Sequence, residues 1–201
     1  MFEGGEACGK STQAALLAVR LDALLTREPG GTQLGEQIRR LVLDTATHRI
    51  DHRAETLLMA AARAQHVNEM IRPALEAGRD VVCDRYVGSS LAYQGYGRGL
   101  PLEEVRAVSE FATGGLVPDV TVLLTVDSGE AARRRQDRMA PDRRADDRLD
   151  AEGEDFHRRV AAGYRALAAA QPDRWRAVEG TGPVDEVAQR VLAAVDQVLT
   201  H

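Results

Sequence analysis

The chain has 201 residues, of which 44% are hydrophobic and 28% charged, and this composition fits one compact domain over residues 1–201. The net charge of −5 argues against a general nucleic-acid binder. No apolar run reaches the roughly 20 residues of a membrane helix, and the start lacks the character of a secretory signal, so we expect a cytoplasmic protein. Cys8 and Cys83 are too few for a disulfide framework and lack metal-ligand spacing.

The first predicted unit is a strand, a loop and a helix. Residues 2–9 are typical of a strand that enters a glycine-containing turn, and apolar residues recur at helical spacing from Ser11 to Leu21. A second strand ends at Leu24 to Thr26. The connection before it is shorter than helix-to-strand connections usually are, and the first strand is equally short. We therefore predict that residues are missing at both places.

Helices and strands alternate along the rest of the chain. The patterns predict helices over residues 33–43, 54–77, 102–112, 154–170 and 184–199, and strands over 80–83, 120–126 and 174–178. This order predicts an α/β fold with a mostly parallel five-stranded sheet and helices on both faces. Residues 130–150 are rich in arginine and aspartate without apolar periodicity, which indicates a solvated, mobile segment.

A phosphate-binding loop follows the first strand. Residues 4–11 fit the pattern G-x-x-x-x-G-K-[ST] between a strand and a helix, and Lys10 is the only lysine in the chain. Its glycines let backbone N–H groups surround phosphate oxygens, the lysine neutralises β- and γ-phosphate charge, and Ser11 is a ligand for Mg²⁺. The motif predicts a three-layer fold of the P-loop NTP hydrolase type. The predicted ATP-binding residues are Gly4, Gly5, Glu6, Ala7, Cys8, Gly9, Lys10, Ser11 and Thr12.

Three further segments combine arginine with small or turn-forming residues: residues 26–32, 61–65 and 84–94. Two of them directly follow predicted strands. In parallel sheets, ligands bind outside the carboxyl ends of the strands, so we expect Arg27 and Arg85 to face the same crevice as the phosphate loop. There they can bind an anionic second substrate, although each arginine taken singly is more often a surface ion-pair partner.

The motifs FEG…GKSTQ, TREPGGT, AAR.Q and DRY..SSLAYQG.GRG together resemble the bacterial thymidylate kinase family over nearly the whole chain. The resemblance implies transfer of the γ-phosphoryl group of ATP to thymidine monophosphate, a step towards dTTP. It implies that Arg63 and Arg85 hold the acceptor phosphate with help from Arg39, and that Asp84 orients Mg²⁺ or the attacking oxygen. The implied substrate-binding residues are Glu6 and Glu28 beside the sugar, Ser90 and Gln94 on the thymine edge, and Arg27, Pro29, Met59, Arg63, Arg85, Arg39 and Tyr93.

The arginine-rich segment resembles the lid of the family members that carry their basic catalytic residue there, because position 7 of the phosphate loop is alanine. Phosphoryl transfer needs in-line positioning, exclusion of water and positive charge on the transferred group. We expect a lid at about residues 134–150, in which Arg148 matches the family motif best. The implied catalytic residues are Lys10, Asp84, Arg148, Arg138 and Arg134, with Ser11 and Asp84 on the metal.

Two departures from the family pattern keep alternatives open. Met59 stands where a phenylalanine usually stacks on thymine, although a thioether still contacts aromatic faces, and it is equally compatible with a core role. Ala7-Cys8 replaces a more flexible glycine-containing pair. The alternatives are a monophosphate kinase of relaxed specificity, a non-catalytic nucleotide-binding switch, and a family member with impaired catalysis. The resemblance also implies a homodimer.

Overall fold

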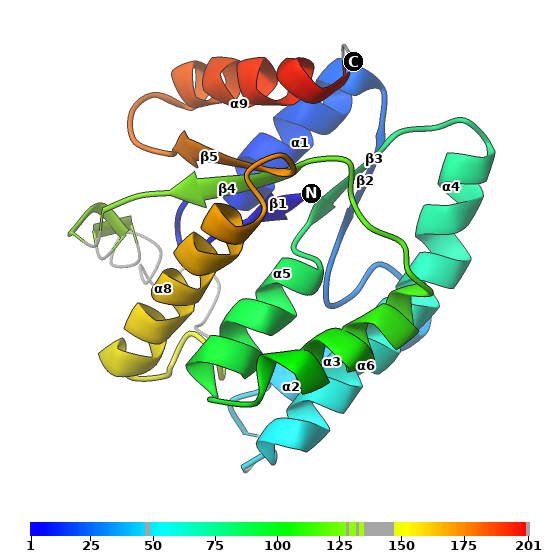
Figure 1. Ribbon diagram of the computed structural model, residues 1–201, viewed down its shortest axis with the longest axis vertical. Helices are drawn as coiled ribbons and strands as arrows, with labels where there is room; N and C mark the ends of the chain where they lie inside the picture. Colours follow the sequence, from blue (N-terminus) through cyan, green and yellow to red (C-terminus); the bar gives the residue numbers. More distant parts are fainter. Residues whose placement is uncertain (47–48, 128, 132, 135–146, 200–201) are drawn as a thin grey trace.

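The computed structural model describes residues 1–46, 49–127, 129–131, 133–134 and 147–199, and it shows a sheet with helices on both faces (Figure 1). The strands are β1 Phe2–Glu3, β2 Leu24–Arg27, β3 Val81–Asp84, β4 Thr121–Thr125 and β5 Trp175–Glu179. Their order is β2-β3-β1-β4-β5, and all of these pairings are parallel. The predicted α/β fold is therefore confirmed.

The short β1 lies at the centre of the sheet. Phe2 aligns with Asp84 of β3 and Val122 of β4, and the backbone N–H of Arg85 donates to the Phe2 carbonyl at 2.9 Å. After helix α1 (Lys10–Leu21), only Asp22 and Ala23 lead into β2, and the Ala23 N–H donates to the Ala18 carbonyl. The prediction that residues are missing at these two places stays a prediction.

The remaining helices agree with most of the predicted ranges. They are α2 Gln33–Leu43, α3 His52–His66, α4 Arg72–Glu76, α5 Val87–Ser90, α6 Leu102–Thr113, α8 Glu154–Ala170 and α9 Val184–Leu199, with π-helical segments η1 Val67–Ile71 and η2 Leu91–Gly97. The helix predicted at 54–77 is α3, η1 and α4 in succession. The sequence analysis assigned no element to α5 and η2, because their small and polar residues lack apolar periodicity.

Two apolar clusters lie on opposite sides of the sheet. One joins α1 and α9 through residues such as Leu17 and Val191. The other joins α2, α3, η2 and α8 and includes Met59, Tyr93 and Phe156. Figure 1 shows the corresponding helices on either side of the strands. This arrangement leaves the carboxyl ends of β1, β2 and β3 free to carry a site.

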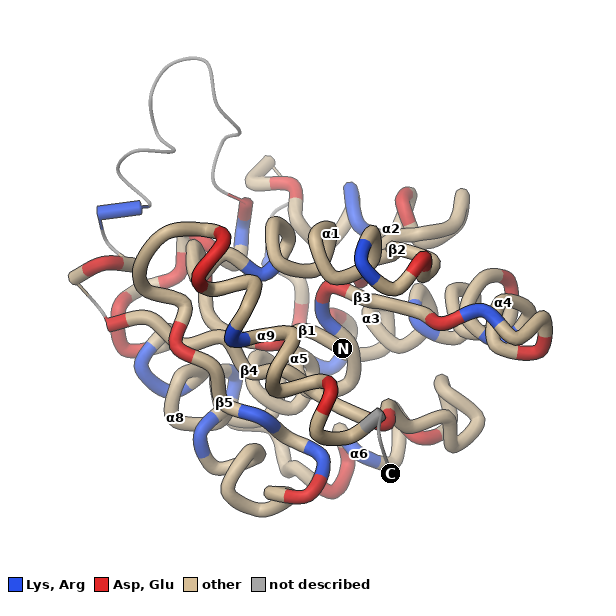
Figure 2. The backbone as a smooth tube through the Cα atoms, turned by 90° about the horizontal axis from the view of Figure 1, so that it is seen from above, with Lys and Arg blue, Asp and Glu red and all other residues tan. Residues whose placement is uncertain are grey.

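Basic and acidic residues are interspersed along the described chain (Figure 2). None of the described helices is both long and apolar enough to cross a membrane. Most of the lid predicted at about 134–150, including Arg138, lies outside the described residues.

Candidate functional site

One cavity opens beside the phosphate loop, and residues from six parts of the chain line it. The structure brings all predicted substrate-binding residues together there: Glu6, Arg27, Glu28, Pro29, Arg39, Met59, Arg63, Arg85, Ser90, Tyr93 and Gln94. Lys10, Ser11 and Asp84 share the same cavity. Sequence positions separated by more than 80 residues therefore form a single surface, as the carboxyl ends of parallel strands predict.

The phosphate loop passes close to β4. A side chain at Gly4 (φ 143°) would place its Cβ 2.4 Å from the Leu124 carbonyl oxygen, so only glycine fits. Ala7 adopts a left-handed conformation with φ 58°. This conformation costs an alanine about 1–2 kcal/mol more than it costs a glycine. The Lys10 ammonium donates to the Gly5 carbonyl at 2.6 Å and lies 3.6 Å from Cys8 Sγ. The lysine is thus held at the loop that it serves.

Ser11 and Asp84 meet at the loop's edge. Ser11 Oγ donates to Asp84 Oδ2 at 2.5 Å, and Asp84 Oδ1 is buried without a hydrogen-bond partner among the described residues. A buried carboxylate oxygen without a donor is costly unless something else satisfies it. A hydroxyl and a carboxylate are hard oxygen donors, so this pair fits Mg²⁺.

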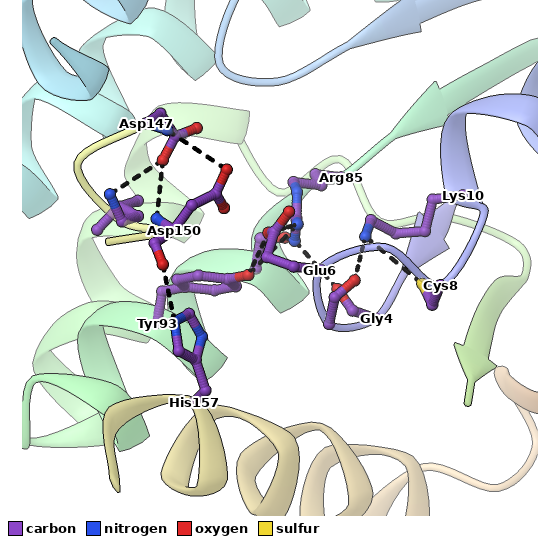
Figure 3. Close-up of polar contacts among 12 residues, drawn as sticks. Gly4, Glu6, Cys8, Lys10, Arg85, Tyr93, Asp147, Asp150 and His157 are labelled. Carbon is purple, nitrogen blue, oxygen red and sulfur yellow. Dashed lines mark hydrogen bonds and ion pairs between the residues drawn. The ribbon is translucent and has the colours of Figure 1, made fainter. Parts of the chain in front are cut away.

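Arg85 links the acceptor side of the cavity to the phosphate loop (Figure 3). It directly follows β3 and has φ 72°. Its Nη2 donates to Glu6 Oε1 at 2.5 Å, its Nη1 donates to the Gly4 carbonyl at 3.2 Å, and the Tyr93 hydroxyl also donates to Glu6. The guanidinium is therefore fixed next to the loop that would carry the ATP phosphates.

Arg63 is held in the cavity by contacts with Glu28, Tyr86 and Ser90. Its Nε donates to Glu28 at 2.7 Å, and its Nη2 donates to Ser90 Oγ and to the Tyr86 carbonyl. Its Nη1 is buried without a partner among the described residues. The sequence analysis grouped Arg63 with Arg85 on the phosphate, and that role stays a prediction. The structure adds a contact with Ser90, one of the residues predicted on the base edge.

Gln94 and Met59 line the same region. Gln94 is buried in η2, and its Nε2 donates to Glu55 Oε1 at 2.9 Å. Sequence reasoning missed Glu55, which is fully buried on α3. It lies four residues before Met59 and eight before Arg63, so a carboxylate on the buried stripe of an amphipathic helix was the available signal. Met59 belongs to the apolar cluster and also lines the cavity, so both of its proposed roles have a structural basis.

The lid arginines occupy separate places. Arg148 Nε donates to the Val42 carbonyl at 2.8 Å and its Nη2 donates to Glu55 at 2.5 Å, and it is not among the cavity-lining residues. Leu149 beside it is buried, so the prediction of a solvated segment is wrong at this end. Arg134 donates to the Gly180 carbonyl at 3.0 Å and lines a second hollow with Cys8, Gly9 and Thr12. Of the two, only Arg134 lies beside the phosphate loop.

A turn at the end of the predicted lid adds an unforeseen carboxyl pair (Figure 3). Asp147 Oδ1 accepts from the Asp150 N–H at 3.0 Å, and Asp150 shares the cavity with Glu6. Burial, the negative charge of Glu6 and Asp147, and a hydrogen bond to Glu6 raise the pKa of Asp150 to about 7. Burial works against ionisation of Glu6 as well, but Arg85 and Lys10 outweigh it and hold the pKa of Glu6 well below its usual range. Of Asp150 and Glu6, Asp150 is therefore the residue that holds the proton.

This pair predicts a pH-dependent stability. Between the ordinary aspartate pKa of about 4 and about 7, folded Asp150 keeps a proton that the unfolded chain has lost. Raising the pH through this window therefore lowers the free energy of unfolding of the wild type, but not of Asp150→Asn, which cannot ionise. We expect the difference in Tm between Asp150→Asn and the wild type to rise by about 2–4 °C in favour of the variant from pH 5 to pH 8. A change of this size corresponds to about 1 kcal/mol in the free energy of unfolding.

Thermal melts at several pH values test this expectation. Asp173→Asn serves as the control, because Asp173 is an exposed carboxylate near the start of β5. It should follow the wild type at every pH. A Tm difference between Asp150→Asn and the wild type that stays constant from pH 5 to pH 8 would contradict the assignment.

Known proteins with related sequences agree on one family. The family model described as thymidylate kinase matches residues 2–191. The chain is 47% identical to a thymidylate kinase of Roseiflexus sp. (strain RS-1), with 98% of this chain and 93% of the relative covered. It is 50% identical to a thymidylate kinase of Thermomicrobium roseum, with 98% and 94% covered.

A solved structure extends the agreement to three dimensions. The crystal structure of a thymidylate kinase from Ehrlichia chaffeensis superposes with a TM-score of 0.77 at 27% identity, and 96% of each chain is covered. Because the family model and these relatives span nearly the whole sequence, the chain belongs to the thymidylate kinase family.

Proposed function

We propose that this chain transfers the γ-phosphoryl group of ATP to thymidine monophosphate, giving ADP and thymidine diphosphate. The single observation that carries the proposal is the shared cavity. It places Lys10 of the phosphate loop in the same space as Arg85 and the buried polar groups of Arg63 and Gln94. A donor site and an acceptor site that face each other are what phosphoryl transfer between two nucleotides requires.

ATP lies with its phosphates on the phosphate loop. The N-terminus of α1 and the loop amides surround the phosphate oxygens, and Lys10 neutralises the β- and γ-phosphates. The second hollow, which Thr12, Arg134 and Gly180 line on the other side of the loop, suits the nucleoside part of the donor. In this position Arg134 is the described lid arginine that can approach the triphosphate. The catalytic assignments of Arg148 and Arg138 stay predictions.

Ser11 and Asp84 hold Mg²⁺ in this proposal. Their oxygen atoms fit the ion, and the unpartnered Asp84 Oδ1 gives it a direct or water-mediated ligand. When bound, the ion neutralises charge that develops on the β- and γ-phosphate oxygens. No group of three or more His, Cys, Asp or Glu side chains forms a metal cage in the described part of the chain. That fits Mg²⁺, which usually takes few protein ligands and keeps water and substrate phosphates.

The acceptor lies across the cavity with its phosphate toward Arg85 and Arg39. A planar guanidinium binds phosphate oxygens in pairs. The thymine ring then reaches Arg63, Ser90 and Gln94, and Met59 contacts its face. We therefore assign Arg63 to the base, because its Nη2 donates to Ser90 Oγ on the base edge, and its Nη1, which has no partner among the described residues, can donate to a ring carbonyl. An acceptor phosphate oxygen attacks the γ-phosphorus and ADP leaves.

The chain acts as a cytoplasmic homodimer in this proposal. Leu41 on α2, Leu57 on α3 and Phe111 on α6 expose large apolar side chains. These three helices lie together on the side of the molecule away from α9 (Figure 1). A second copy that covers them would remove apolar surface from water.

An acceptor panel tests the proposed activity. The purified protein is mixed with MgATP, and ADP release is followed with thymidylate, deoxyuridylate, deoxycytidylate, adenylate, guanylate or no acceptor. We expect turnover that depends on thymidylate and falls at least about tenfold with deoxycytidylate and the purine nucleotides. Equal turnover with several acceptors would indicate a relaxed monophosphate kinase. ATP binding without turnover on any acceptor would indicate a non-catalytic protein.

A further inference from the structure

Glu55 is a fully buried carboxylate that no step of the proposed reaction uses. It extends from α3 and accepts four hydrogen bonds. Its Oε1 accepts from Gln94 Nε2 at 2.9 Å and from Arg98 Nε at 3.3 Å, and its Oε2 accepts from Arg98 Nη2 at 3.1 Å and from Arg148 Nη2 at 2.5 Å. Burial favours the neutral acid, but hydrogen bonds from Arg98, Gln94 and Arg148 outweigh it and lower the pKa of Glu55. Glu55 is therefore ionised in the folded protein.

An ionised carboxylate fixes the orientation of its amide neighbour. Glu55 has no proton to donate, so the Gln94 amide must turn its NH₂ group toward Glu55. The carbonyl oxygen Oε1 is then left for the cavity that Gln94 lines. Without the carboxylate, the two orientations of a glutamine amide have the same shape and differ only in where they place donor and acceptor.

The orientation sets a donor and acceptor pattern for the base. Arg63 Nη1 supplies one donor without a partner among the described residues, and Gln94 Oε1 supplies one acceptor. Thymine and uracil offer the complement, a carbonyl at position 4 and an N–H at position 3. Cytosine offers the reverse, an amino group at position 4 and an unprotonated nitrogen at position 3. The buried pattern thus discriminates between pyrimidines by their edges.

We propose that Glu55 is a positioning residue for acceptor specificity: it holds the Gln94 amide in the orientation that accepts a hydrogen bond from N3 of thymine and disfavours cytosine. The inference rests on the proposed function and deepens it. Arg98 and Arg148 take part as the cations that keep a charged carboxylate inside the protein. The lid-end arginine is accordingly linked to base recognition rather than to the transferred phosphate.

The test compares kcat/KM for thymidylate, deoxyuridylate and deoxycytidylate in the wild type and in Glu55→Gln. The new amide keeps its oxygen toward the two arginines and turns its NH₂ toward Gln94, which must then rotate and present its own NH₂ to the cavity. We expect the thymidylate to deoxycytidylate ratio to fall at least about tenfold. The thymidylate to deoxyuridylate ratio should stay unchanged, because both bases have the same edge. Ratios do not depend on the fraction of active enzyme.

Matched variants separate positioning from general damage. Glu152→Gln removes the other carboxylate that pairs with Arg98, at 2.6 Å, without contacting Gln94, and should leave both ratios unchanged. In a Gln94→Ala background, Glu55→Gln should change the thymidylate to deoxycytidylate ratio no further. If Glu55→Gln does not fold, Glu55→Gln/Arg148→Met removes one cation that has lost its partner and is measured in the same way.

Either of two results would overturn the inference. The first is a thymidylate to deoxycytidylate ratio that stays within twofold of the wild type in a folded Glu55 variant. The second is a change in that ratio on Glu55→Gln that is as large in the Gln94→Ala background as in the wild-type background. A wild type that turns over none of the three acceptors would instead refute the proposed function.

Discussion

Replacing Lys10 with methionine should reduce kcat by a factor on the order of 10² to 10³, the usual loss when one group that stabilises developing charge is removed. Lys10 is the only lysine, it is buried in the phosphate loop, and its ammonium is held at 2.6 Å from the Gly5 carbonyl. Methionine keeps the length of the side chain and removes its charge. Steady-state ADP release with saturating thymidylate measures the effect.

Arg20→Met is the matched control for this loss. Arg20 is an exposed cation in the last turn of the same helix, so the variant also removes one positive charge. It should keep kcat within twofold of the wild type. A Lys10→Met enzyme with kcat close to that of the wild type would show that Lys10 does not act on the transferred group.

The single lysine also permits a direct chemical test. An amine-acylating reagent modifies only one side chain of this protein, and peptide mass spectrometry distinguishes it from the α-amine. MgATP should slow acylation of Lys10, whereas thymidylate alone should protect it much less. Equal acylation with and without MgATP would contradict placement of the ATP phosphates at Lys10.

The fold could be predicted from sequence because its signals are local. Apolar periodicity gave most helices, and alternation of helices with short apolar strands implied a parallel sheet. The α5 and η2 region was missed because its small and polar residues pack against a site rather than form a stripe. The short connection after α1 has Asp22 in the left-handed conformation, which apolar periodicity does not predict.

The candidate site could be predicted in its membership but not in its internal pairings. Motif residues at the ends of strands converge on one cavity, as Lys10, Asp84 and Arg85 do. The ion pairs and hydrogen bonds between these side chains are set by tertiary packing. Arg148 contacts Glu55 from a distance of 93 residues, and Arg63 contacts Glu28 and Ser90. No spacing rule predicts such pairs.

Replacing Asp84 with asparagine should lower kcat by a factor on the order of 10² to 10³ and raise the Mg²⁺ concentration needed for half-maximal rate. Asparagine retains an oxygen that accepts from Ser11 Oγ, so the local hydrogen bond at 2.5 Å survives. It loses the negative charge, and its amide nitrogen cannot serve as a ligand for a hard cation. The loss corresponds to several kcal/mol of charge stabilisation in the transition state.

A titration of kcat against Mg²⁺ at saturating ATP and thymidylate separates this role from a structural one. Asp80→Asn is the control, because Asp80 is an exposed carboxylate just before the same strand and distant from the loop. It should leave both the rate and the Mg²⁺ dependence unchanged. If Asp84→Asn lowers the rate while the Mg²⁺ midpoint stays that of the wild type, the carboxylate positions Ser11 or the acceptor rather than the ion. Because Arg85 directly follows Asp84, that result would leave the end of β3 with a positioning role toward Ser11 or the acceptor and none toward the ion.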